Sequence, residues 1–448
     1  MGGLGGHMSH LHEDLDLTFQ NLLGILGMIA RTELTVTEKV DGYNLFISYT
    51  VDEDGDILID GDVRAYRNKS DVAKGGMSPD EYASKWKGHP AEQGFMKGFT
   101  VVSKALKTLT GEELREIFEN GDRYLNMEIM YYDPSTGRDA NIINYGASYI
   151  VMHGLMEGDN MDVEATAAFN KLVNALQSSE VEVDNQTWEV HGPTVIELNN
   201  IADGEAHTKL IEEITALSQE AGGLNSRIHD YAKGRYSKIC SGKGLSPQEC
   251  STLTDIVFDY FDDSTLDDKV AKEKRRMAYN AFKKTLSPEN KKIASKLGTV
   301  SNSFKVVLGT LRPLEKIISD FAIEVLRDVK SAFAVDHDAA VKKMKSDLNN
   351  AIDKIKRLDA ENTFDLVKQL EKLGDPENTV TSSLEGIVFK APNGRVYKLT
   401  GSFAMLNQII GRAMRIREPD PSEDEGIIKE SYLKNMIKDA LFSHFYRN

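Results

Sequence analysis

One short segment contains residue types that could carry out phosphoryl chemistry. It reads EKVDGYN at residues 38–44, so that Lys39 is followed by Asp41 and Gly42 between two strand-like segments. A lysine attacks a phosphorus atom only as the neutral amine, although its ordinary pKa is about 10.4, so it needs a desolvated site with other cations nearby. Gly42 would let the backbone approach a nucleotide closely. Taken alone, the segment also fits an ordinary strand-end lysine followed by a turn.

Further residues follow Lys39 along the chain and could complete a phosphate site. They are Arg64, Glu128, Glu385, Gly386, Lys390 and Lys398. Glu385 is a hard oxygen ligand that suits Mg²⁺, and Glu128, on a strand, can accept hydrogen bonds from ribose hydroxyls. Lys390 and Lys398 could neutralise the negative charge that spreads over phosphoryl oxygens in the transition state.

The order and types of these residues resemble those of the covalent nucleotidyltransferases, the superfamily of ATP-dependent DNA and RNA ligases and capping enzymes. By this resemblance Lys39 matches motif I and Glu128 matches motif III. Glu385 and Lys390 match motif IV, and Lys398 matches motif V. The resemblance implies that Lys39 forms a lysyl-AMP from ATP with Mg²⁺ or Mn²⁺, passes the AMP to a 5′-phosphate end and seals that end to a 3′-OH.

The resemblance also implies a fold and a role for each residue. It covers residues 31–202 and 376–400, as a ligase-type nucleotidyltransferase (adenylylation) domain with antiparallel sheets. It assigns catalysis to Lys39, Asp41, Lys390 and Lys398, nucleotide binding to Glu38, Gly42, Asn44, Arg64, Glu128, Tyr149, Glu385 and Gly386, and metal binding to Glu385.

Asn44 and the C-terminal segment favour the RNA ligase branch. Many DNA ligases read K-x-D-G-x-R, but here Asn44 stands in the arginine's place, as in the second RNA ligase family of T-even phages and the RNA-editing ligases. Residues 401–448 are helical in period and too short for the OB barrel of DNA ligases. Residues 397–408 are similar to proteins of large tailed phages, which predicts a phage protein in the host bacterial cytoplasm.

Other functions remain open beside ligation of RNA or a nicked duplex. They are ATP-dependent DNA ligation, transfer of AMP to a protein or small molecule, and a non-catalytic phage protein that keeps the fold to bind nucleic acid. Val396 occupies the place of the first motif V lysine, which Arg395 could replace, and Arg67 competes with Arg64 for the phosphate-facing role. The residue that stacks on adenine could be Tyr149, Met152 or His153.

The hydrophobic pattern predicts an α+β chain that carries a large helical insertion. Strand patterns occur at 45–51, 57–59, 124–131, 149–155, 194–198, 384–390 and 395–399, and helical periods at 91–109 and 163–176. Between 203 and 375 helix start signals recur, such as Ser246-Pro-Gln-Glu249 and Ser287-Pro-Glu289. We therefore expect an N-terminal scar and helix (1–30), a nucleotidyltransferase domain (31–202 with 376–400), an all-helical insertion (203–375) and C-terminal helices (401–448).

The insertion holds a basic segment in an acidic chain. The chain has 54 Lys and Arg against 70 Asp and Glu, which gives −16, whereas residues 269–296 hold ten basic and two acidic residues. Such a helix pair predicts a track for a phosphate backbone. The alternative is a solvated helix face with Tyr279 and Phe282 in the core. The residues expected to bind nucleic acid are Arg275, Arg276, Lys283 and Lys284.

Composition excludes several other classes of protein. No uncharged apolar stretch approaches the roughly 18 residues that a membrane span requires. Two cysteines, Cys240 and Cys250, cannot form a disulfide framework, which is typical of a reducing cytoplasm. The opening MGGLGGHM is typical of a cloning scar, and His7, His10 and His12 are expected to belong to a tag remnant or a solvated stretch rather than to a metal site. The sequence does not predict an oligomeric state.

Overall fold

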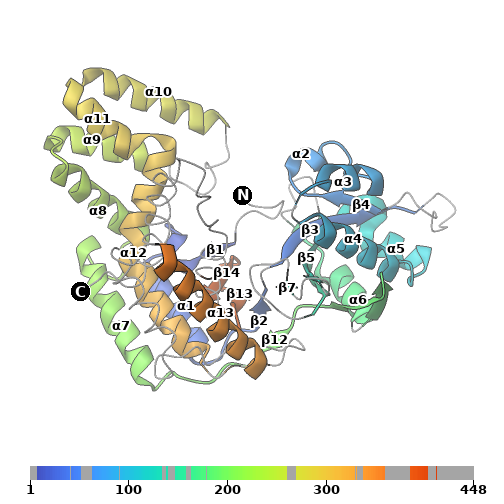
Figure 1. Ribbon diagram of the computed structural model, residues 1–448. Coiled ribbons are helices and arrows are strands. Elements are labelled where there is room, and N and C mark those ends of the chain that lie inside the picture. The colour runs from blue at the N-terminus through green and yellow to red at the C-terminus, as the bar shows by residue number, and fades with distance from the viewer. Residues whose placement is uncertain are drawn as a thin grey trace.

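The chain folds around two larger β-sheets. The computed structural model describes residues 8–40, 42–51, 63–89, 91–133, 138–139, 147–157, 163–177, 179–259, 269–327, 329, 337–358, 384–401 and 410. Within them the fold is mixed α+β and the sheets are mostly antiparallel, so the predicted class is confirmed. One sheet and its helices lie on one side of the molecule, and the other sheet lies among long helices on the opposite side (Figure 1).

The larger sheet has seven strands. Their order is β10 (Ser179–Val183), β11 (Gln186–His191), β8 (Tyr149–Glu157), β5 (Arg123–Met130), β3 (Tyr43–Tyr49) and β4 (Val63–Tyr66), with β9 (Val163–Glu164) paired to β8. Neighbouring strands are antiparallel, except that β11 and β8 are parallel. The strand patterns predicted at 124–131 and 149–155 are confirmed as β5 and β8.

Alternation of side chains gives this sheet two different faces. Leu45 and Ile47 are fully buried in a core formed with the helices on one side of the sheet. These helices are α3 (Pro79–Trp86), α4 (Glu92–Leu106), α5 (Gly111–Phe118) and α6 (Thr166–Leu176). Asn44 and its cross-strand partner Glu128 point to the other side, because successive side chains of a strand alternate. We call this side the polar face.

The smaller sheet has five strands, which come from distant parts of the chain. Their order is β1 (Ser9–His10), β14 (Val396–Thr400), β13 (Gly386–Lys390), β2 (Val36–Lys39) and β12 (Val195–Ile196). The strands predicted at 384–390 and 395–399 are confirmed as β13 and β14. They form a hairpin whose turn is closed by a 2.9 Å hydrogen bond from Ala391 N to Arg395 O. One face of this sheet, which includes Val36, Ile387 and Leu399, is buried against helices.

Helices cover that face and share its hydrophobic core. The helices that contribute to this core are α1 (Phe19–Ala30), α7 (Glu205–Ser218), α8 (Ile228–Gly242), α9 (Pro247–Phe258), α10 (Lys269–Thr285), α11 (Pro288–Gly298) and α12 (Val300–Val325). A further helix, α13 (His337–Leu358), buries Met344, Leu348, Ala351 and Ile352 outside this core. Ser246 and Ser287 cap α9 and α11 as their sequence signals predict. The helical segment therefore packs on the five-stranded sheet through one continuous core.

Short elements complete the described chain. They are η1 (Leu11–Glu13), α2 (Lys69–Val72), η2 (Glu119–Gly121), η3 (Gln219–Ala221) and the strand pair β6 (Tyr132–Asp133) and β7 (Arg138–Asp139). The strand predicted at 57–59 and nearly all of the helical region predicted at 401–448 lie outside the described residues. Within the described part of the chain, no helix is both long and apolar enough to cross a membrane.

The N-terminal segment is part of the fold. β1 pairs with β14 in parallel, and Leu11 is fully buried in the core of the helical side. His12 is only 8% exposed, so the prediction that this histidine is solvated is wrong. The sequence argument failed because two or three residues carry too little periodicity to indicate an added edge strand.

Candidate functional site

Lys39 ends β2 on the face of the five-stranded sheet opposite to the helical core, beside a carboxylate from far along the chain. Its Nζ forms an ion pair with Glu385 Oε1, and the Lys39 and Glu385 side chains are 16% and 3% exposed. The two residues meet because β13 pairs with β2, with Gly386 directly opposite Lys39. We call this side of the sheet the Lys39 face.

Glu38 lies on the opposite side of the same strand. Along β2 the buried residues Val36 and Glu38 alternate with the partly exposed Thr37 and Lys39. Glu38 is 4% exposed and stands opposite Ile387, whose side chain is in the helical core. Glu38 was expected to bind nucleotide, but strand alternation turns it away from the Lys39 amine.

Glu128 brings a second carboxylate to Lys39 from the seven-stranded sheet. Its Oε2 accepts a 3.3 Å hydrogen bond from Gly42 N and lies 3.7 Å from His153 Nε2. Burial by itself raises the pKa of Glu128, but the hydrogen bond and charge of His153 and the charge of Lys39 bring that pKa below its ordinary value. The site thus keeps Glu128 ionised. Asp41, which the resemblance assigns to catalysis, lies outside the described residues.

The two glycines of the site leave no room for a side chain. A Cβ on Gly42 would stand 2.5 Å from Met130 Sδ and 2.7 Å from Ile129 O. A Cβ on Gly386 would overlap the carbonyl oxygen of Leu399 in the next strand. Both glycines therefore allow the backbone around Lys39 to pack closely on neighbouring strands.

Asn44 and Arg64 lie on the polar face, whereas Arg67 packs on the helices of the other side. Asn44 Nδ2 donates to Asn126 Oδ1 at 2.8 Å. Arg67 donates to the Asn44 carbonyl, and its guanidinium lies 4.8 Å from the centre of the Phe95 ring. Arg64 stands opposite Ser48 on the same face as Asn44, with a side chain 40% exposed. Arg64 is therefore the more accessible of the two arginines, whereas the Arg67 guanidinium is fixed by the Asn44 carbonyl and the Phe95 ring.

The three candidates for adenine stacking lie on two faces of the seven-stranded sheet. Tyr149 stands opposite Met130, so it shares the polar face with Glu128, and it is 4% exposed. His153 lies on that face as well, with a side chain 29% exposed. Met152 packs in the core with α3 to α6 and cannot reach a ligand on the polar face. The prediction thus narrows to Tyr149 or His153.

The two remaining lysines share the Lys39 face. Lys398 and Thr37 both stand opposite Val388, so all three side chains point to one side. Strand spacing and rise place the Lys398 Cα about 12 Å from the Lys39 Cα. Lys390 lies farther along β13, is 63% exposed, and its Nζ is 3.8 Å from Glu164 Oε2. Lys398 is therefore the closer of the two to the Lys39–Glu385 pair.

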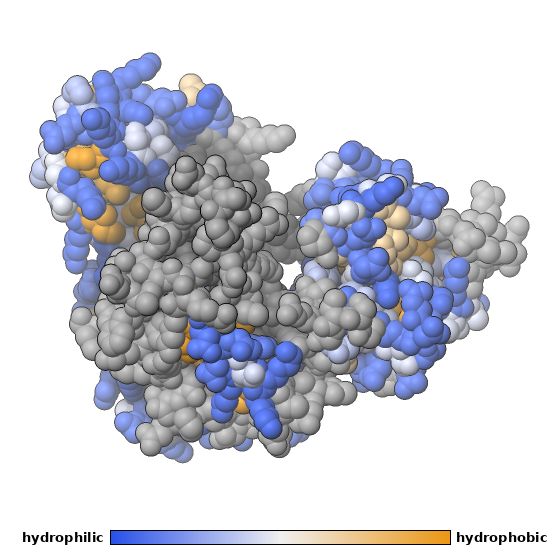
Figure 2. Space-filling model, viewed as in Figure 1, coloured by the Kyte–Doolittle hydropathy of each residue, from blue (hydrophilic) through white to orange (hydrophobic). Residues whose placement is uncertain are grey.

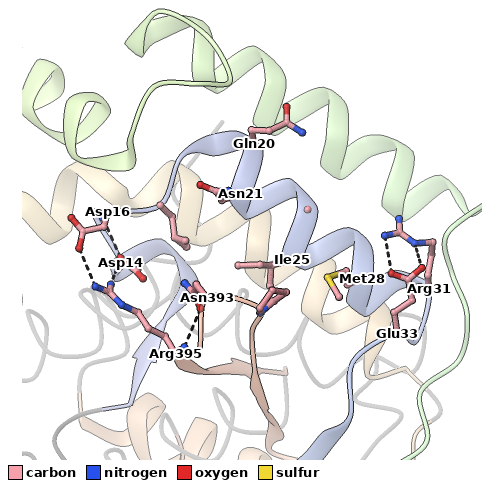
Figure 3. A pocket seen from close by; sticks show the side chains of 13 residues that line it. Asp14, Asp16, Gln20, Asn21, Ile25, Met28, Arg31, Glu33, Asn393 and Arg395 are labelled. Atoms are coloured by element: carbon pink, nitrogen blue, oxygen red, sulfur yellow. Dashed lines mark hydrogen bonds and ion pairs between the residues drawn. The ribbon is translucent and has the colours of Figure 1, made fainter.

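Arg395 does not lie where the resemblance would require a cation beside Lys398. Its guanidinium pairs with Asp14 at 2.7 Å and with Asp16 at 3.1 Å. These contacts raise the pKa of Arg395 and hold it beside α1, as Figure 3 shows. The expectation that Arg395 stands in for Val396 is wrong, because Arg395 faces the side of the sheet opposite to Lys398.

The pocket in Figure 3 lies on that other side of the sheet. It has a volume of about 780 Å³ and lies between α1 and the β13–β14 turn. Its walls mix apolar residues such as Ile25 and Met28 with the Arg31–Glu33 and Asp14–Arg395 ion pairs. Lys39 and its carboxylate partners do not line this pocket.

The basic helices differ in part from the sequence prediction. Arg275 is 4% exposed and its guanidinium donates to Ser303 Oγ, so it is not available to nucleic acid. Burial also lowers the pKa of Arg275. Arg276 is exposed but bonds to Glu273, and Tyr279 and Phe282 lie in the core as the alternative interpretation states. An amphipathic helix buries one stripe, and Arg275 falls on it.

Lysines on α10 and α11 form a basic surface instead. Figure 2 shows that the end of the molecule where these helices lie is largely hydrophilic. Lys283 is partly exposed and Lys284 is exposed. We call the following exposed lysines the α10–α11 basic surface: Lys274, Lys284, Lys292 and Lys296.

The site offers carboxylates for a metal but no dense cluster. Among the described residues, no group of three or more His, Cys, Asp or Glu side chains could hold a metal ion. Mg²⁺ commonly binds through one or two carboxylates together with substrate phosphates, so Glu385 and Glu128 fit such a requirement. Cys240 and Cys250 are both free and buried.

The chain was compared with family models, with curated proteins and with solved structures, and no match was found.

Proposed function

We propose that the chain is an ATP-dependent polynucleotide ligase that acts through a lysyl-AMP at Lys39. The observation that supports this most is the contact of the Lys39 amine with Glu385, 346 residues away in sequence. The carboxylate of Glu128, from the seven-stranded sheet, gives further support, because the charge of Lys39 helps to lower the pKa of Glu128. Both carboxylates favour the charged form of Lys39, so the proposal requires Lys39 to give a proton to Glu385 before Nζ can attack.

The proposed chemistry follows from these side chains. The neutral Nζ of Lys39 attacks the α-phosphorus of ATP, the new P–N bond forms, and the bond to pyrophosphate breaks. Glu385, in contact with Nζ, is placed to hold the proton that the amine gives up. Glu128 accepts hydrogen bonds from the ribose, and Lys398 stabilises the negative charge on phosphate oxygens. A Mg²⁺ ion at Glu385 would supply further positive charge when bound.

The proposed acceptor is a 5′-phosphate end in RNA or in a nicked duplex. Asn44 supports the RNA ligase branch, because its amide is fixed on the polar face by Asn126. The α10–α11 basic surface supports a polyanionic partner in a chain whose net charge is −16. DNA ligation is the alternative within the same chemistry.

Transfer of AMP to a protein or small molecule is the second candidate. Val396 is 44% exposed at the place where ligases of this superfamily have a lysine, and Arg395 points away from it. A site with one fewer cation for phosphate would favour an acceptor other than a polynucleotide end.

Incubation with α-labelled ATP and Mg²⁺ tests the proposal. We expect covalent label on the wild type and none on Lys39→Ala. The matched control is Lys171→Ala, which also removes a lysine paired to a glutamate, Glu116, but on an outer surface. It should be labelled like the wild type. An unlabelled wild type, or a labelled Lys39→Ala, would refute the lysyl-AMP. Nicked RNA, nicked DNA and protein acceptors added to labelled enzyme then separate the branches.

A further inference from the structure

The long helix α12 begins without a side-chain cap. Thr299 precedes it in extended conformation, and its side chain accepts no hydrogen bond from the first turn. The first backbone N–H groups of a helix have no partner within the helix, and the helix dipole makes this end positive. Such an end binds an anion where further donors meet it.

A buried guanidinium points to this end of α12 from α10. Arg275 is 4% exposed, and it donates to the hydroxyl of Ser303 in the first turn of α12. Its Nε is buried without a hydrogen-bond partner, and no described carboxylate contacts the guanidinium. An arginine keeps its proton in proteins, so a positive charge is buried here without a described counter-charge. Burying an uncompensated charge is costly, which favours a bound anion.

Tyr279 brings a second buried donor to the same place. It follows Arg275 by four residues on α10, so both side chains lie on one face of that helix. Its ring packs against Gly298, where an added Cβ would stand 2.6 Å from Tyr279 Cε2, two residues before α12 begins. The Tyr279 hydroxyl is buried and has no hydrogen-bond partner in the described part of the chain. Arg275 and Tyr279 therefore approach the start of α12 together.

Tyr236 of α8 is a further buried member of this cluster. Its hydroxyl donates to the carbonyl of Leu297 at 3.0 Å, so that donor is already used. The charge of Arg275 and the ring of Tyr279 both influence the pKa of Tyr236, which places it near both side chains. Burial is the main cause of the shift and raises this pKa, so the Tyr236 hydroxyl stays neutral and does not balance Arg275.

We propose that Arg275, Tyr279 and the N-terminus of α12 bind one small inorganic oxyanion of the phosphate or sulfate type. A tetrahedral oxyanion accepts several hydrogen bonds at once, which suits the Arg275 Nε, the Tyr279 hydroxyl and the free N–H groups of α12. The burial of Arg275 favours a free ion over a nucleic-acid backbone, which needs an exposed track. The ion balances the guanidinium charge and links α10 to α12. This site does not depend on the chemistry proposed for Lys39.

Calorimetric titration of the full chain with inorganic phosphate tests this inference. Gluconate, which is too large for a buried site, keeps the ionic strength constant. We expect saturable binding by the wild type, no detectable binding by Arg275→Met, and about tenfold weaker binding by Tyr279→Phe, since each removes a hydrogen bond to a charged group. Arg276→Met removes the adjacent exposed arginine, which pairs with Glu273, and as the matched control it should bind like the wild type.

Thermal unfolding gives a second measurement, and Tyr279→Phe, which removes one oxygen atom, tests the site even if Arg275→Met fails to fold. Phosphate at ten times its dissociation constant should raise the melting temperature of the wild type by about 2 °C, and that of Tyr279→Phe by less than half as much. The rise in the wild type should saturate with phosphate concentration.

Four results would overturn the inference. They are no phosphate binding by the wild type, equal affinity of the wild type and both α10 variants, a melting temperature that rises linearly with phosphate in every variant, and loss of binding in Lys39→Ala but not in Arg275→Met. The linear rise is the general effect of such salts, and the last result would assign the phosphate to the Lys39 face. None of these measurements requires a lysyl-AMP, so a failure of the labelling experiment is separate from a failure here.

Discussion

The stability of the protein should depend on pH through His12. Its folded-state pKa is lowered from the ordinary 6.5 to about 3, because the ring is buried and lies near the charge of Lys398. Unfolding exposes the ring, so below pH 6.5 the His12 ring is protonated in the unfolded chain but stays neutral in the folded chain until the pH approaches 3. Stability from this group is therefore complete above pH 6.5 and is lost progressively as the pH falls toward 3.

The size of the effect follows from the two pKa values. Between pH 7 and pH 5 the free energy of unfolding should fall by about 2 kcal/mol, and between pH 7 and pH 3 by about 4 kcal/mol. His12 is only 8% exposed, so solvent screens little of this effect. Carboxylates such as Glu128, whose pKa is lowered in the folded state, also make the protein less stable as the pH falls, but at lower pH than His12 does.

A comparison of wild type with His12→Gln isolates the histidine. Urea unfolding at pH 7, 6 and 5 gives the free energy for each protein, and glutamine does not titrate. We expect the advantage of the wild type over His12→Gln to shrink by about 2 kcal/mol from pH 7 to pH 5. His229→Gln serves as the control and should follow the wild type. Parallel pH profiles for wild type and His12→Gln would refute the reasoning.

Two other predictions concern the close packing at Lys39 and the basic helices. Gly42→Ala should lower self-adenylylation more than tenfold, because its Cβ would stand 2.5 Å from Met130 Sδ. Gly24→Ala is the control, because a Cβ at this position in α1 meets nothing within 4 Å, and this variant should be labelled fully. Equal labelling of the two variants, whether full or lost, would contradict the prediction. Changing the four lysines of the α10–α11 basic surface to Glu should weaken binding to a nicked duplex and leave self-adenylylation unchanged. The slope of log K against log salt concentration should become shallower, by the equivalent of up to about four phosphate contacts. The same reversal at four exposed lysines elsewhere among the helices should leave binding intact, and equal losses would contradict a local track. These control lysines are Lys209, Lys238, Lys243 and Lys305.

Local sequence patterns predicted several of the elements, but not α3, α5, β10 or β11. The strand pattern at 124–131 predicted β5, the Ser246 capping signal predicted the start of α9, and the patterns at 384–390 and 395–399 predicted β13 and β14. Each of these depends on residues close together in the chain, whose dihedral preferences and capping hydrogen bonds act without the rest of the fold. The residue types around Lys39 were likewise visible, because the order of charged residues does not depend on packing.

Tertiary structure alone decided which face each of these side chains occupies. Glu38 and Lys39 are neighbours in sequence, yet one is buried against helices and the other meets Glu385. Arg275 is buried while Arg276 is exposed, and only the packing of α10 on its neighbours makes that distinction. Pairing between strands that are hundreds of residues apart decides which face of a strand, and so which every second side chain, is buried against the helices. A local pattern contains the alternation but not the partner that covers it.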